Sequence, residues 1–162
     1  MGWFSTLLMG APWTPERVER YEVDAEALIV CGLGIGDHNA LVEPRLGPPD
    51  RFLDRRRGTY FYHALGLVFF SDEAGLLRSL SVYGSGCHGE FGLFAGRWLP
   101  ARLCEGVREP DEEAFVELFG EPTRRYEDDG TDGPTLEWSR GNMTVSVDLD
   151  REGLLAEFSV DK

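Results

Sequence analysis

The sequence has few cysteines, an excess of acidic over basic side chains and none of the short motifs that mark common catalytic sites. Its 162 residues include three cysteines, Cys31, Cys87 and Cys104, and an odd number at unrelated spacings indicates neither a disulfide framework nor a zinc site. The chain contains no P-loop, no Gly-x-Ser-x-Gly and no His-Glu-x-x-His, which are the signatures of phosphate-binding, hydrolase and zinc-protease sites. We therefore expect no catalytic residues, no cofactor and no metal ion.

Basic charge is also scarce. The chain carries 29 acidic and 16 basic side chains, for a net charge of −13, and phosphate contacts need lysine and arginine, so nucleic acid is not an expected partner. The acids concentrate in residues 101–162, which carry 17 acidic and 7 basic side chains. Such a surface would steer a basic protein partner toward it. The alternative is that the charge only keeps the protein soluble.

A leader or membrane segment is not evident either. Met1–Gly10 is apolar, but it lacks the basic start and small-residue cleavage site of a signal peptide and is too short to cross a bilayer. We expect a cytoplasmic protein with no membrane partner, in which this segment docks on the body. The 20 glycines and 9 prolines predict many turns and short elements rather than a helical bundle.

The strongest positive feature is an internal repeat. Leu46-Gly-Pro-Pro-Asp-Arg51 recurs as Phe119-Gly-Glu-Pro-Thr-Arg124, and Gly75-Leu-Leu-Arg-Ser-Leu-Ser-Val82 recurs as Gly153-Leu-Leu-Ala-Glu-Phe-Ser-Val160, with five of the last eight positions identical. A repeat at a fixed order predicts that one structural unit occurs twice.

Each unit is predicted to be a short helix followed by three antiparallel strands. The helices are expected at 39–46 and from 111 to 119, each ended by Gly and Pro. The strands are expected at 60–63, 67–70 and 76–83, and at 135–139, 143–149 and 154–160. Further strands are expected at 21–23 and 28–31, where a short helix ending near Tyr21 is the alternative, and at 90–94.

Alternation of apolar and polar residues predicts which side chains are buried. In the strand at 143–149 every second residue is apolar, so these side chains point inward,. The same rule, applied to the last strand, predicts that four of its side chains point inward: Leu154, Ala156, Phe158 and Val160. The first unit is apolar on both faces, so its strands are either central or present aromatics to a partner.

These patterns predict an α+β fold: two tandem helix-then-antiparallel-meander repeats forming one twisted sheet with helices on one face. The expected divisions are an N-terminal segment at 1–26, a first repeat at 27–88 and a second repeat at 89–162.

Cys87, His88 and Glu90 are the only thiol, imidazole and carboxylate that crowd together in the sequence. A catalytic Cys–His pair normally meets through the fold rather than along the chain, so a thiol enzyme is the least supported alternative. His38, His63 and His88 do not have metal-ligand spacing.

The remaining hypothesis is that the protein has a surface that recognises another protein. Tyrosine and tryptophan are enriched at interface hot spots, and carboxylates on the solvent side of the second unit would meet a basic partner. The predicted partner-binding residues are Tyr60, Tyr62, Tyr83, Glu137, Trp138, Asp148 and Glu157. The alternative is that Trp138 and two of the tyrosines belong to the core.

With its two [Leu/Phe]-Gly-x-Pro turns and two Gly-Leu-Leu strands, the chain resembles the β-lactamase-inhibitor-protein-like (BLIP-like) architecture and bacterial cytoplasmic proteins of the immunity type. The resemblance implies a non-catalytic module that masks a basic protein, for example a toxin. The missing signal peptide and odd cysteine count disfavour inhibition of a β-lactamase itself. The alternative is a structural or assembly factor acting as a homodimer through the aromatic first unit.

Overall fold

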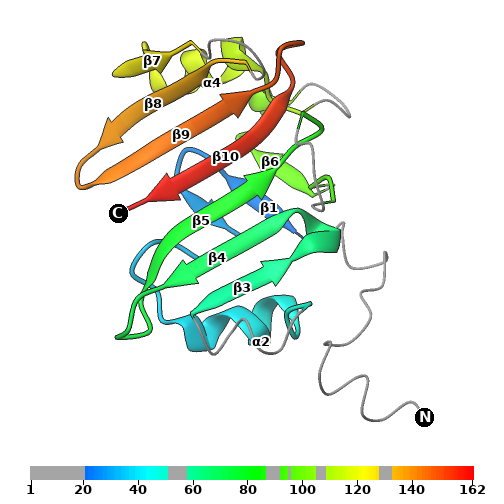
Figure 1. Ribbon diagram of the computed structural model, residues 1–162, viewed down its shortest axis with the longest axis vertical. Coiled ribbons are helices and arrows are strands. Elements are labelled where there is room, and N and C mark those ends of the chain that lie inside the picture. The colour runs from blue at the N-terminus through cyan, green and yellow to red at the C-terminus, as the bar shows by residue number, and fades with distance from the viewer. Residues whose placement is uncertain (1–20, 51–57, 87–91, 95, 105–108, 128–132) are drawn as a thin grey trace.

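The computed structural model describes residues 21–50, 58–86, 92–94, 96–104, 109–127 and 133–162 (Figure 1). In these residues the protein is mixed α and β and mostly sheet. The larger sheet has seven strands in the order β3-β4-β5-β10-β9-β8-β7, and all its neighbours are antiparallel. Its strands are β3 (Thr59–Tyr62), β4 (Leu67–Ser71), β5 (Leu77–Tyr83), β7 (Arg124–Tyr126), β8 (Thr135–Arg140), β9 (Met143–Leu149) and β10 (Leu155–Asp161).

A second, three-stranded sheet lies behind the larger one in Figure 1. It consists of β1 (Glu22–Asp24), β2 (Ile29–Val30) and β6 (Arg97–Leu99), with β1 antiparallel to β2 and parallel to β6. The predicted hairpin of 21–23 with 28–31 is therefore confirmed, and the boundary expected between residues 26 and 27 falls in its turn. The strand expected at 90–94 lies partly outside the described residues, and 92–94 form no strand.

Two short α-helices lie at opposite ends of the row of strands, α2 (Val42–Leu46) beside β3 and α4 (Glu112–Phe119) near β7 and β8 (Figure 1). Single 3-10 turns occur at Asn39–Leu41, His63–Leu65 and Ala101–Leu103. Asp111 caps α4 by accepting a hydrogen bond of 3.0 Å from the Ala114 N–H, which satisfies one of the donors left unpaired at a helix start. None of the helices in the described ranges is long and apolar enough to cross a membrane.

Both α-helices end in the same way. Gly47 and Gly120 follow the last helical residue with φ of 83° and 80°, a conformation that a side chain would strain. The carbonyl of Gly47 accepts a hydrogen bond of 2.8 Å from the Tyr62 hydroxyl, and that of Gly120 accepts one of 2.8 Å from the Trp138 indole N–H. An aromatic donor on a strand therefore fixes each helix end to the sheet.

The hairpins β4–β5 and β9–β10 also share their geometry. The carboxylate of Asp72 accepts from the backbone of Ala74 and Leu76, and that of Asp150 accepts from the corresponding Glu152 and Leu154. The ladder of each hairpin then shifts register by one residue at the start of its second strand. The residues bulged out of register are Arg78 and Ala156, the fourth positions of the two Gly-Leu-Leu segments.

The core fills the space between the two sheets and α4. The large sheet contributes Phe158, the small sheet Trp98 and α4 Phe115; the ring centroids of Trp98 and of Phe115 each lie 5.7 Å from that of Phe158. Burying side chains of this size contributes about 1.5–3 kcal/mol each. Because all these rings meet one face of the large sheet, we call it the covered face.

The bulge in β10 overturns part of the burial pattern expected from alternation. Leu155 is 1% exposed whereas Leu154 is 44% exposed, the reverse of the prediction. The bulged Ala156 lets Leu155 and Phe158 both point to the covered face although they are three residues apart,. From Phe158 onward the prediction holds.

Candidate functional site

The face of the large sheet opposite the covered face carries hydroxyl and carboxylate side chains over its four central strands. Paired residues share a face of a sheet, and every second residue along a strand does so too. The register places the following on this face: Ser79, Ser81 and Tyr83 of β5; Glu157, Ser159 and Asp161 of β10; Thr144, Ser146 and Asp148 of β9; Thr135, Glu137 and Ser139 of β8. We call these twelve residues the hydroxyl–carboxylate face. They include no lysine, arginine or aliphatic side chain.

Four of the predicted partner-binding residues lie on this face. Tyr83 pairs with Glu157, and Glu157 pairs on its other side with Asp148; Glu137 lies on the next strand, opposite Ser146. All four are partly exposed. The structure thus places these four residues together on the solvent side of the sheet, as expected. Their role in binding stays a prediction.

The other three predicted partner-binding residues were wrongly expected to be exposed. Tyr60, Tyr62 and Trp138 are 6%, 1% and 3% exposed and belong to the core. Trp138 follows Glu137 directly, and neighbours along a strand point to opposite faces, so the two cannot share one surface. Tyr62 and Trp138 instead fix the helix ends. The alternative that Trp138 and two of the tyrosines are core residues is the one that holds.

Glu157 is the electrostatic centre of the face. Burial raises the pKa of the Glu157 carboxyl above its ordinary value, and the carboxylates of Asp148 and Asp161 raise it further, whereas a hydrogen bond with Ser81 acts in the opposite direction. Asp148 also accepts a hydrogen bond of 2.5 Å from the Thr135 hydroxyl. The strands therefore hold two further carboxylates, those of Asp148 and Asp161, where they act on Glu157.

Within the described residues, no basic side chain forms an ion pair with Asp148, Glu157 or Asp161. The ion pairs that are present lie at other places: Arg78–Asp72, Arg97–Glu22, Arg125–Glu112 and Arg125–Glu127. At the edge of the sheet the Tyr126 hydroxyl lies 3.3 Å from a carboxylate oxygen of Glu137. The three central acids thus keep their negative charge available to a partner.

The same face of the sheet is aromatic at its β3 and β4 end. Phe61 packs edge-to-face on Phe70 with 6.3 Å between centroids and stacks on His63. Phe70 is 41% exposed, so part of its ring contacts solvent. The face therefore changes from aromatic over β3 and β4 to acidic over β10 and β9, and at the far edge Arg124 of β7 lies opposite Glu137.

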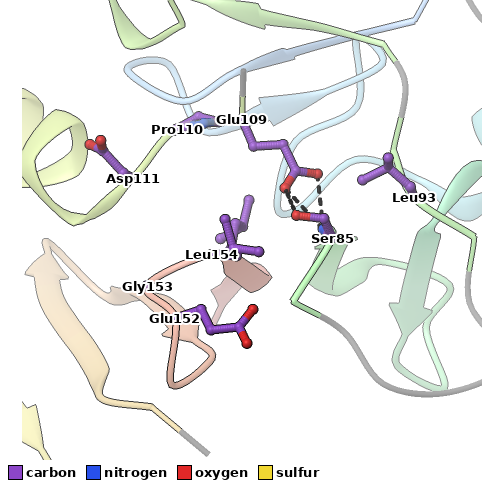
Figure 2. A pocket seen from close by; sticks show the side chains of 9 residues that line it. Ser85, Leu93, Glu109, Pro110, Asp111, Glu152, Gly153 and Leu154 are labelled. Carbon is purple, nitrogen blue, oxygen red and sulfur yellow. Dashed lines mark hydrogen bonds between the residues drawn. The ribbon is translucent and has the colours of Figure 1, made fainter. Parts of the chain in front are cut away.

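A pocket of about 580 Å³ opens beyond the end of the face where β5 leaves the sheet and β10 enters it (Figure 2). Sequence reasoning missed it because its walls come from segments far apart in the chain. It is lined by Ser85, Leu93, Glu109, Pro110, Asp111, Glu152, Gly153, Leu154 and Leu155. The volume is within the range of pockets that bind small ligands or a single side chain.

Cys87, His88 and Glu90, the basis of the thiol-enzyme alternative, lie outside the described residues. Burial raises the pKa of the Cys31 thiol to about 12, so it is protonated and unreactive at neutral pH. No group of three or more His, Cys, Asp or Glu side chains in the described ranges is arranged to hold a metal ion.

Comparisons with known proteins give a structural neighbour and no family. No protein-family model matches the sequence, and no curated protein matches it. Among solved structures the chain is similar to a DUF4309 family protein, YjgB, from Bacillus subtilis subsp. subtilis strain 168, with a TM-score of 0.54, 13% sequence identity and 90% of each chain covered. Similarity at this identity shows a shared fold only.

Proposed function

We propose that the protein is a non-catalytic binding module whose hydroxyl–carboxylate face covers a basic site on a protein partner, in the manner of an inhibitor or immunity protein. The observation that carries the proposal is the group Asp148, Glu157 and Asp161, three acids that form no ion pair in the described residues and lie on a face of short hydroxyl side chains. A basic partner would neutralise charges that now repel one another.

The shape of the face supports this function. Serine and threonine side chains are short, so the backbone of a partner can approach the sheet closely. The strands hold the carboxylates in place, which lowers the ordering cost of binding. A polyanion would be repelled by the same charges.

We infer also that residues 39–83 and 111–161 are two copies of one helix-then-meander unit with BLIP-like architecture. The supporting observations are the matched helix ends, the matched aspartate-capped hairpins and the matched bulges at Arg78 and Ala156. The odd number of cysteines favours a reducing compartment such as the cytoplasm,.

The test compares two triple variants of equal net charge. The face variant is Asp148→Asn, Glu157→Gln, Asp161→Asn, and the control is Glu26→Gln, Glu73→Gln, Glu121→Gln at three exposed positions elsewhere. Proteins captured from the source cell by the wild type are identified and purified, and their affinities for all three chains are measured by calorimetry at low and high salt.

The expected partner is basic and binds the face variant roughly 10–100-fold more weakly, about 0.5–1 kcal/mol for each lost charge. The control variant should bind like the wild type. A partner that binds the face variant and the wild type equally would refute the proposed surface.

The aromatic end of the face favours self-association as a second candidate function. Phe70 is 41% exposed and packs on Phe61, and contiguous apolar patches on a surface mark contact sites. We expect Phe70→Asp to convert a dimer into a monomer in light scattering if this end is a homodimer interface. A wild-type protein that is monomeric at all concentrations would exclude this candidate.

A further inference from the structure

We propose that the pocket beyond the face receives an arginine side chain of the same basic partner. This inference rests on the proposed function for the source of the arginine. It extends that function by naming an anchor residue in the partner and a second, separate site on this chain. Flat interfaces commonly gain most of their affinity from a few side chains that fill pockets.

The charge of the pocket selects a cation. Glu109, Asp111 and Glu152 line it, and none of the described residues that line it is a lysine, arginine or histidine. Asp111 is used as the cap of α4, and Figure 2 shows its carboxylate turned toward that helix, whereas Glu109 and Glu152 lie on either side of Leu154. The two glutamates are therefore the groups that a cation would contact.

Glu109 is held in place before any ligand arrives. Both its carboxylate oxygens accept from the Ser85 N–H, at 3.0 and 2.9 Å, and one accepts from the Ser85 hydroxyl at 2.6 Å. A carboxylate has about four acceptor positions, so one remains for a further donor. The fixed carboxylate also acts on its surroundings: burial first, and then Glu109 and Asp111, raise the pKa of the Cys104 thiol to about 11.

The apolar walls favour a guanidinium group over an ammonium group. Leu93 and Leu154, which are 49% and 44% exposed, are two of the few large apolar side chains that contact solvent in the described residues, and both line this pocket together with Pro110. A guanidinium is planar, weakly hydrated and able to lie against apolar surface while it donates to a carboxylate, whereas an ammonium is compact and strongly hydrated. The pocket thus offers apolar walls for the side-chain stem and carboxylates for its charged end.

The test uses small probes and NMR on the whole chain. Nα-acetyl-arginine amide, Nα-acetyl-lysine amide and the uncharged Nα-acetyl-citrulline amide are titrated into the 15N-labelled protein. The arginine probe should shift the amide signals of Ser85, Glu109 and Leu154 and bind more tightly than the lysine probe, and citrulline should not bind. Absence of shifts at these amides, or equal binding of arginine and citrulline, would overturn the inference.

Variants then assign the binding to the pocket. Glu152→Gln should weaken the arginine probe roughly fivefold, as expected for one partly exposed ion pair, and Leu154→Ala should weaken it by a similar factor. Glu73→Gln is the matched control, because Glu73 is exposed in the turn of the corresponding hairpin and does not line the pocket. Equal effects of Glu152→Gln and Glu73→Gln would show a general charge effect and refute the site.

The same variants separate this inference from the proposed function. If the captured partner loses affinity for the face variant but not for Glu152→Gln or Leu154→Ala, the face binds the partner and the arginine anchor is wrong. If the arginine probe binds the pocket while the face variant binds the partner normally, the pocket is supported and the proposed face is wrong.

Discussion

Replacing Glu157 by glutamine should make the folded protein more stable at neutral pH. The substitution keeps the size of the side chain and a partner for Ser81, but it removes a negative charge that lies directly opposite Asp148. Burial and Asp161 also raise the pKa of the Glu157 carboxyl. Like charges that face each other across two strands cost about 0.2–1 kcal/mol. For a domain of this size that range corresponds to a rise in Tm of about 1–4 °C.

The direction of this stability change follows from how the free energy of unfolding depends on pH. The folded-state pKa of Glu157 is raised above the ordinary glutamate value of 4.5, so the wild type loses stability as pH rises through that range and the carboxyl ionises. Below the ordinary value the carboxyl is protonated in the folded and unfolded chain alike, and wild type and Glu157→Gln should then unfold at the same temperature. The difference in unfolding temperature between the two proteins should therefore appear as the pH rises from acidic to neutral.

Thermal unfolding followed by circular dichroism at several pH values and low salt measures the effect. The control is Glu26→Gln at an exposed position in the β1–β2 turn, for which we expect no change. Added salt should shrink the gain, because it screens the interaction with Asp148 and Asp161. A Glu157→Gln protein that is equally or less stable than wild type at pH 7 would refute the electrostatic description of the face.

Four further substitutions test the fold that supports the face. Tyr62→Phe should cost about 1–2 kcal/mol in urea unfolding, because it removes the hydroxyl that bonds the Gly47 carbonyl,; an unchanged midpoint would mean that this bond does not fix the helix. Leu155→Ala should cost about 2–5 kcal/mol and Leu154→Ala less than about 1 kcal/mol, and the opposite order would contradict the bulge. Asp111→Ala should cost about 1 kcal/mol through loss of the helix cap, measured in the same urea titration.

The sequence predicted the elements well because their signals are local. The strand at 143–149 alternates apolar and polar residues throughout and has the predicted bounds. The second helix ends at Phe119, where Gly120 was expected to stop it. The first helix was expected at 39–46, and the structure has a 3-10 turn at Asn39–Leu41 followed by α2 with five residues.

The errors arise where burial depends on distant neighbours. The bulge at Ala156 follows from how β10 meets β9, and no local pattern distinguishes Leu154 from Leu155 in the Gly-Leu-Leu segment. Tyr60 and Tyr62 flank Phe61, so this strand is aromatic on both faces and the sequence could not tell which face is covered. The pocket could not be predicted, because Ser85, Glu109 and Glu152 meet only through the fold.

The open face of the sheet differs between the two halves of the proposed repeat, so we expect its partner to present an amphipathic rather than a uniformly basic surface. Each half has a residue on this side of the sheet just before its bulge: Phe70 in the first half and Asp148 in the second, each paired with the residue after the bulge, Ser79 and Glu157 respectively. One backbone position therefore carries a ring on β4 and a carboxylate on β9. Since long-range charge sets the approach of a partner and apolar contact lowers its dissociation rate, a partner that matches both ends would have basic side chains over β9 and β10 and an apolar contact over Phe70.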